Sequence, residues 1–235
     1  MGKVSLNFRG DMKVGRPKLL DREKVIDVAL CQYWQHGIDN VGMADIARLS
    51  GFDRAGIYKE FGGENGLALE VIENYYETHV AQRLPIFDAI DSPVEQLKLL
   101  IDGFINNNVI KDLSIYGVHD DSLKWPKPPA KSRGCAYYGL MVSDTRVTFA
   151  GKTKRKVNQL EASNREWYQG LIAKAEKEGR LKEGVTVEEA VDFVEDHMLL
   201  MQLLSRQASN KDRMLRAKNM LLKSLFAESS LSIQH

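Results

Sequence analysis

The sequence predicts an all-α protein, and three observations support this fold class. Apolar residues recur at helical spacing along most of the 235 residues, and alternating strand patterns are scarce. Helix-start signals precede several apolar runs, as in the two capping-box sequences Ser92-Pro93-Val94-Glu95 and Thr186-Val187-Glu188-Glu189. Glycine pairs and prolines separate the helical stretches. We therefore expect a small helical N-terminal domain followed by a larger helical domain.

Composition and cysteine content favour a globular protein of the cytoplasm. Hydrophobic residues make up 43% of the chain and charged residues 28%. No run of about 18 apolar residues is present, and the first residues lack the apolar core of a secretory signal. Two cysteines, Cys31 and Cys135, do not make a disulfide framework. We expect these thiols to be small packing residues, with a redox switch as the alternative.

Charge is distributed unevenly along the chain. The net charge is +1, yet residues 1–18 hold five basic side chains against one acidic side chain. We predict that residues 1–18 form a flexible basic arm able to lie along a phosphate backbone. For residues 1–12 a solvated tail is the alternative.

The first predicted helices lie within residues 19–64. Asp21 is a candidate N-cap for a helix ending at Gly37. A short helix over 43–50 follows, and then a second one, with Asp53 as its N-cap, reaches Phe61. Gly62-Gly63 interrupts the pattern, and a long helix is expected from about Glu64 to residue 81.

Residues 65–235 are predicted to form the second domain. Beyond the long helix, helical segments are expected from Pro93, within 135–149, and at about 153–177, 187–207 and 211–227. Residues 120–133 contain three prolines and are predicted to be a loop.

Two short helices joined by a tight turn after a longer helix form a helix-turn-helix unit. The apolar core expected to support it consists of Ile26, Leu30, Ile46, Ala47, Ile57 and Phe61. This core would hold the second short helix at the depth of a DNA major groove. Arg54, Ala55 and Gly56 would then face base edges, with Tyr58 and Lys59 toward the groove edge or backbone. Similar helix pairs also occur in helical proteins that do not bind DNA.

Several positions within residues 15–75 match a known pattern in residue type and spacing: Gly15-Arg16-Pro17-Lys18, Ala29-Leu30, Gly37, Asp45-Ile46-Ala47, Ser50-Gly51-Phe52-Asp53, Ile57-Tyr58, Phe61 and Leu67. In these positions residues 15–75 resemble the N-terminal domain of the TetR family of bacterial transcriptional regulators. The resemblance implies a regulator, most simply a repressor, that binds a near-palindromic double-stranded DNA operator as a homodimer and is released by a small-molecule effector. It adds Arg16, Lys18, Gly42 and Met43 to the expected DNA contacts.

The same resemblance implies dimerisation through the last two helices, at about 187–207 and 211–227. The expected seam residues are Val191, Val194, Met198, Met201, Leu215 and Leu222. The alternative is that these side chains only fill the core of their own subunit.

Four positions depart from the family pattern. Gly42 replaces a threonine, Asp53 a serine, Glu60 an aromatic residue or histidine, and Glu64 a phosphate-binding lysine. Carboxylates near phosphate are repulsive, although Glu64 would also stabilise the start of its helix. The alternative function is therefore a helical ligand-binding module of the same fold with weakened or lost DNA binding.

The resemblance also implies an effector pocket among the middle helices. The expected lining consists of Phe104, Tyr137, Tyr138, Met141, Trp167, Phe193 and His197, although aromatic residues at helical spacing also serve as plain core. His119-Asp120-Asp121 could bind a metal but fits a polar loop better. No catalytic set or nucleotide fingerprint is present, so we expect no enzyme activity, no cofactor and no metal site.

Overall fold

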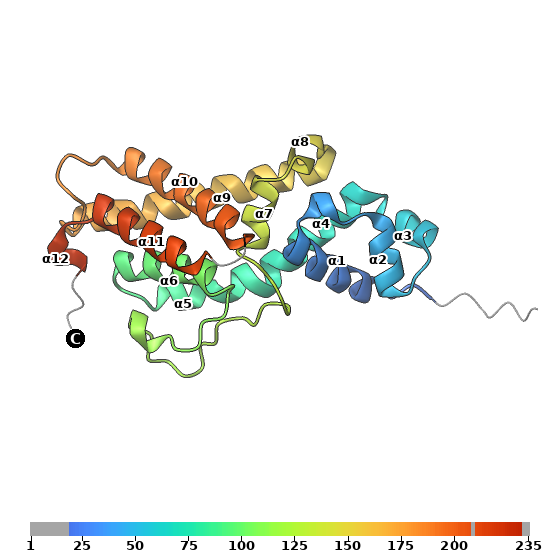
Figure 1. Cartoon of the computed structure of the whole chain (residues 1–235), viewed down its shortest axis with the longest axis horizontal. Coiled ribbons are helices and arrows are strands. Elements are labelled where there is room, and N and C mark those ends of the chain that lie inside the picture. The colour runs from blue at the N-terminus through green and yellow to red at the C-terminus, as the bar shows by residue number, and fades with distance from the viewer. Residues whose placement is uncertain (1–18, 208–209, 232–235) are drawn as a thin grey trace, which may run out of the picture.

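The computed structural model describes residues 19–207 and 210–231, and these residues confirm the all-α prediction. The predicted arm over residues 1–18, including Arg16 and Lys18, lies outside the described residues. Two parts are visible in Figure 1. Helices α1, α2 and α3 gather at one end, α6, α9, α10 and α11 form the other part, and α4 leads from the first to the second.

The N-terminal helices have nearly the predicted bounds: α1 (Arg22–His36), α2 (Met43–Ser50), α3 (Arg54–Phe61) and α4 (Glu64–Tyr75), with a 3₁₀ turn at Ile38–Asn40. The two predicted N-caps are confirmed. The Asp21 carboxylate accepts from the Lys24 backbone N–H at 3.1 Å, and the Asp53 carboxylate accepts from the Gly56 N–H at 2.9 Å. Gly51 ends α2 in the left-handed region, at φ 76°, which favours glycine.

The predicted helix from 64 to 81 is helical throughout, but its hydrogen-bond pattern changes after α4. A π-helical turn follows at Tyr76–Val80, then a 3₁₀ turn at Ala81–Arg83 and the short α5 (Leu84–Asp88). In the π turn the Ala81 N–H donates to the Tyr76 carbonyl, five residues back. Such turns contain one extra residue and re-aim the side chains that follow them.

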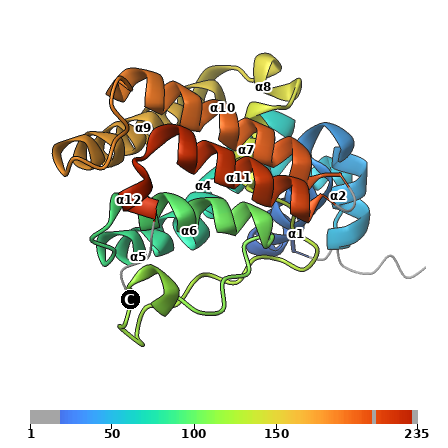
Figure 2. The same ribbon diagram turned by 60° about the vertical axis from the view of Figure 1, so that its left-hand side comes forward.

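The second part contains the remaining helices: α6 (Pro93–Ile105), a 3₁₀ turn (Ser114–Tyr116), α7 (Ala136–Met141), α8 (Thr145–Thr148), α9 (Gly151–Lys177), α10 (Val187–Ser205), α11 (Lys211–Leu225) and α12 (Glu228–Leu231). The predicted loop over 120–133 is confirmed. Helical structure within 135–149 is divided between α7 and α8. Figures 1 and 2 both show α10 and α11 side by side, and the two helices are in contact.

The two predicted capping boxes differ in outcome. At α10, the Thr186 hydroxyl accepts from the Glu189 N–H at 3.2 Å, and the Glu189 carboxylate accepts from the Thr186 N–H at 3.1 Å. At α6, Ser92 caps the Glu95 N–H, but the Glu95 carboxylate pairs with Lys98 at 2.7 Å. The Ser92 cap is therefore confirmed and the reciprocal bond from Glu95 is replaced by an ion pair.

The N-terminal core contains the predicted residues, although Ala47 is only partly buried. It also contains Trp34, which is 1% exposed. The indole Nε1 of Trp34 donates to the Gly134 carbonyl at 3.0 Å. This bond ties α1 to the segment that precedes α7, so the two parts share a packed junction.

The prediction of the dimer seam was wrong for most of its residues. Five of the six belong to the core of a single chain: Val191, Val194, Met198 and Met201 are 0% exposed, and Leu222 is 5% exposed. Side chains already enclosed by α6, α9 and α11 cannot also contact a second copy. Leu215, at 37% exposed, faces solvent. None of the helices within the described residues has the length and apolar character needed to cross a bilayer.

Candidate nucleic-acid interface and ligand cavity

Helix α3 has one buried face and one open face. Ile57 and Phe61, one turn apart, are 0% and 7% exposed and lie in the N-terminal core. Arg54, Ala55 and Lys59 are exposed on the other side of the helix. This division follows from the helical period, because residues four apart lie on the same face. The arrangement presents the early residues of α3 to whatever approaches this end of the molecule.

Tyr58 connects the open face of α3 with the start of α4. Its ring lies 5.4 Å below the Arg54 guanidinium, and its hydroxyl donates to Glu64 at 3.4 Å. The contact with an aromatic face restricts the Arg54 side chain, which lowers the entropy lost when it binds a base or phosphate. Arg54 and Tyr58 thus form a partly organised pair on an exposed surface.

Glu60 is bound within the N-terminal part. Arg22, in the first turn of α1, pairs with Glu60 at 3.0 Å and with Glu70 at 2.5 Å. The guanidinium also lies over the Phe61 ring at 4.8 Å. The hydrogen bond to Glu70 is the main cause that raises the pKa of Arg22. The negative charge of Glu60 is therefore offset by α1, whereas Glu64 has a tyrosine as its partner.

The predicted contacts at the start of α2 occupy different environments. Gly42 is exposed, and its N–H donates to the Asp45 carboxylate at 3.4 Å. Met43 is only 2% exposed and is part of the N-terminal core. The expectation of a Met43 contact therefore needs correction, since only its backbone can reach a ligand. Residues 19–64 hold five basic and eight acidic side chains, so the basic excess lies in residues 1–18.

A second candidate site is a cavity of about 220 Å³ in the C-terminal part. Four of the residues predicted to line a pocket are on its wall: Phe104, Tyr137, Tyr138 and Trp167. Met141, Phe193 and His197 are not on this wall. Phe193 and His197 pack on each other instead, with ring centroids 4.2 Å apart.

The wall also contains residues that the sequence did not point to, chiefly Arg83, Asn108 and Asn164. Arg83 is 7% exposed, and its guanidinium lies 4.6 Å from the ring centroid of Trp125. Its atoms Nε and Nη2 have no hydrogen-bond partner among the described residues. The only sequence signal was a lone arginine between a predicted helix and Pro85.

Neutral tyrosines supply most of the remaining polar groups on this wall. The hydroxyls of Tyr138 and Tyr168 are 2.8 Å apart, and the Asn164 side-chain amide donates to Tyr138 at 2.8 Å. Burial raises the pKa of Tyr138 well above its usual value. Burial also raises the pKa of Tyr75, and the nearby Arg83 acts in the opposite direction by lowering it. These phenols therefore remain protonated and can only offer hydrogen bonds.

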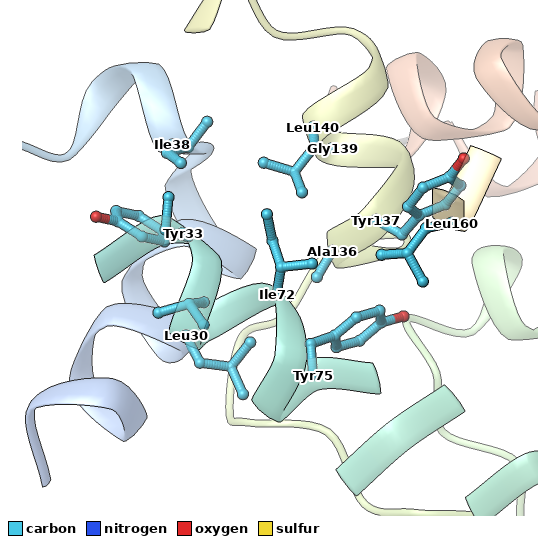
Figure 3. A pocket seen from close by; sticks show the side chains of 12 residues that line it. Leu30, Tyr33, Ile38, Ile72, Tyr75, Ala136, Tyr137, Gly139, Leu140 and Leu160 are labelled. Carbon is cyan, nitrogen blue, oxygen red and sulfur yellow. The ribbon is translucent and has the colours of Figure 1, made fainter. Parts of the chain in front are cut away.

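A smaller pocket lies between the two parts (Figure 3). Its volume is about 30 Å³, and its lining from α1, α4, α7 and α9 is almost entirely apolar, with Ile72 and Leu140 near its centre. The space is about that of one water molecule, but a water there would lack polar partners. The larger cavity is therefore the better ligand site.

Tyr75 belongs to both regions. It lines both pockets and is 4% exposed in the N-terminal core. Its hydroxyl is 3.0 Å from the Cys135 sulfur, and its ring packs at 5.1 Å from Trp34 and 5.5 Å from His79. Cys31 and Cys135 are free thiols and are half-buried rather than fully buried. Burial raises the pKa of Cys31.

The described residues contain no cluster of three or more His, Cys, Asp or Glu side chains placed to hold a metal ion. Asp120 instead accepts a hydrogen bond from the Ser122 N–H at 2.8 Å, as expected of a polar loop.

Fold and site together define the class: a helix-turn-helix protein with a helical, cavity-bearing second part. Residues 25–71 match the sequence profile of bacterial regulatory proteins of the tetR family. A curated relative, the HTH-type transcriptional repressor ComR of Escherichia coli K12, is 34% identical over 68 residues, which are 29% of this chain and 32% of ComR. The chain therefore spans about a third of the length of this relative.

Solved structures extend the likeness of fold to most of the chain. A TetR-family regulator from Agrobacterium tumefaciens has a TM-score of 0.68 at 16% identity, covering 88% of this chain and 97% of the other. The TetR-family regulator CifR, solved with a 26-bp operator DNA, has a TM-score of 0.59 at 17% identity, covering 89% and 99%. Residues 25–71 therefore resemble the N-terminal domain of the tetR family, and the solved structures show the same fold over most of the chain.

Proposed function

We propose that this chain is a ligand-responsive transcription regulator, most simply a repressor, that binds a near-palindromic operator as a homodimer in the cytoplasm. The observation that carries the proposal is the open face of α3, with Arg54, Ala55 and Lys59 exposed above buried Ile57 and Phe61. An exposed arginine on the early part of a recognition helix suits bidentate contact with guanine.

The rival proposal, a module that has lost DNA binding, is weakened by the partner of Glu60. The Arg22 pair offsets this charge and holds the carboxylate against α1. Glu64 remains an exposed carboxylate beside α3, so weakened rather than lost phosphate binding fits better. In this proposal Arg16 and Lys18 of the basic arm, together with Gly42, Gly56, Tyr58 and Lys59, supply further DNA contacts.

For the dimer we propose the outward faces of α10 and α11 instead of the residues expected from the sequence. Exposed apolar side chains remain there: Leu203 at 51%, Leu215 at 37% and Met220 at 68%. The exposed charges are complementary, with Glu188, Asp192 and Asp196 on α10 and Arg213 and Arg216 on α11. Apolar contacts with a charged rim are typical of homodimer interfaces.

Ligand binding is proposed to act through α4. The cavity wall includes Tyr75 at the end of α4 and Tyr76 and Val80 of the π turn, while Leu67 and Val71 of the same helix are in the N-terminal core. A ligand that displaces this segment would move the N-terminal part of each subunit. Two recognition helices must be about 34–36 Å apart to enter successive major grooves. A change in that spacing would release the operator.

The test is selection of bound sequences from a random double-stranded DNA pool, followed by affinity measurements on the selected sequence. Arg54→Ala should lower discrimination between the selected and scrambled sequences by roughly tenfold or more, as expected for loss of one bidentate base contact. Arg180→Ala, three residues beyond the end of α9, is the control and should bind like wild type. Failure to enrich any sequence, or equal discrimination by both variants, would contradict the proposal.

A further inference from the structure

The larger cavity has one charged group in an otherwise neutral wall. Of the described residues that line it, only Arg83 has a formal charge, and the others are chiefly aromatic and aliphatic. Arg83 is only 7% exposed. No carboxylate forms an ion pair with it in the described part of the chain. A buried guanidinium without a carboxylate partner is unfavourable, and such groups persist where a ligand supplies the counter-charge.

The unpaired donors are grouped at one place on the wall. Arg83 offers Nε and Nη2, and Trp125, whose ring lies 4.6 Å from the guanidinium, has an indole Nε1 without a partner among the described residues. The Nε–Nη2 edge of a guanidinium matches the two oxygens of a carboxylate in a bidentate pair. Nearby Tyr75 is a neutral phenol and cannot balance the charge.

The rest of the wall favours an apolar body. Phe87, Phe104 and Trp167 pack edge-on with neighbouring rings, and Leu84, Leu100 and Leu160 add aliphatic surface. An apolar cavity of roughly 150 Å³ accommodates a benzene molecule. The 220 Å³ here therefore has room for one ring or a short acyl chain and a small polar group.

We infer that the cavity binds an amphipathic carboxylic acid, with its carboxylate paired to Arg83 beside Trp125 and its apolar body among the aromatic side chains. A carboxylate fits better than a phosphate monoester, because one arginine neutralises one charge and a phosphate carries about −1.5 to −2 at neutral pH. This inference rests on the proposed ligand-responsive function and specifies the chemical class of its ligand.

The experiment measures binding of benzoate, phenylacetate, 3-phenylpropionate and hexanoate to the full chain by calorimetry and thermal shift. Each acid is paired with its neutral amide, and phenyl phosphate is a further probe. The best acid should bind roughly ten- to a hundredfold more tightly than its amide, the range of a charge-assisted hydrogen bond pair. Trp125 and Trp167 on the wall supply a fluorescence signal for binding within the cavity.

Two variants separate a ligand-binding role of Arg83 from a structural one. Arg83→Met and Arg83→Gln should abolish the preference for acid over amide. Without ligand, Arg83→Met should be at least as heat-stable as wild type, because it removes a buried charge that lacks a carboxylate partner. Arg180→Gln should retain the preference. Four results would each overturn the inference. They are equal binding of acid and amide, binding of none of the acids, tighter binding of phenyl phosphate than of the acids, and a preference for acid over amide that survives in Arg83→Met. Because no DNA is present, these results are independent of whether the protein binds an operator.

Discussion

Replacing Glu64 with lysine tests how the surface around α3 meets phosphate. Glu64 is the first residue of α4, is exposed, and has the Tyr58 hydroxyl at 3.4 Å. Glu64→Lys changes the local charge by two units and leaves the buried side of α4, including Leu67, intact. We expect tighter operator binding together with slightly lower stability of the protein.

The magnitude of both effects can be estimated from the position of the residue. One new lysine–phosphate contact makes the slope of log K against log salt more negative by about 0.9, or about 1.8 for two subunits. Between 50 and 200 mM salt, the variant would lose roughly tenfold more affinity than wild type. A lysine at a helix N-terminus opposes the helix dipole and should cost about 0.3–1 kcal/mol of stability.

The assay is fluorescence anisotropy with labelled operator across this salt range, supported by thermal melts. Glu183→Lys is the matched control, because Glu183 is exposed in the turn before α10 and the substitution changes the net charge identically. If Glu64→Lys and Glu183→Lys have the same salt slope, the gain is a general charge effect. The reasoning that places Glu64 beside phosphate would then be refuted.

Three further predictions concern the ion pair, the junction and the dimer. Arg22→Ala should weaken operator binding several-fold, because it removes the cation that offsets Glu60, and should cost under about 1 kcal/mol of stability. The double variant with Glu60→Gln should restore operator binding in the anisotropy assay. Burial lowers the pKa of His79 from 6.5 to about 4, so the stability of the protein should fall as the pH drops from 6.5 toward 4. Urea unfolding midpoints should show this loss of stability in wild type and a smaller loss in His79→Gln. Leu203→Asp should give monomers in sedimentation without unfolding, whereas Met198→Ala should cost about 2–5 kcal/mol of stability in melts.

Local signals in the sequence were sufficient for the N-terminal part. Asp21 and Asp53 each cap a helix through a bond to a backbone N–H three residues ahead, which requires no distant contact. The apolar spacing of Ile57 and Phe61 likewise sets which face of α3 is buried. The residues of α3 that we propose to face DNA follow from the same period once the buried face is known.

Tertiary packing determines two features that the sequence pattern leaves open: the outward face of α10 and the contact between Arg83 and Trp125. Helix α10 has apolar residues around most of its circumference, so its pattern does not distinguish the side facing α6 and α9 from the side facing outward. Met198 was therefore an expected seam residue until the fold placed it inside, whereas Leu203, which was not among the expected seam residues, lies outside. Arg83 and Trp125, more than 40 residues apart, meet only because the loop over 117–135 folds back across α6.

The position of Tyr75 and the following π turn explains why one helix can connect the two sites. Up to Tyr75, α4 packs against α1 and is part of the N-terminal core. Immediately afterwards the π turn directs Tyr76 and Val80 to the cavity, and Arg83 follows three residues later. A ligand paired with Arg83, as proposed, would therefore act on a segment covalently continuous with the helix that supports α3. Because coupling between two binding sites is reciprocal, a ligand that lowers operator affinity by some factor must be bound less tightly by the same factor when operator is present.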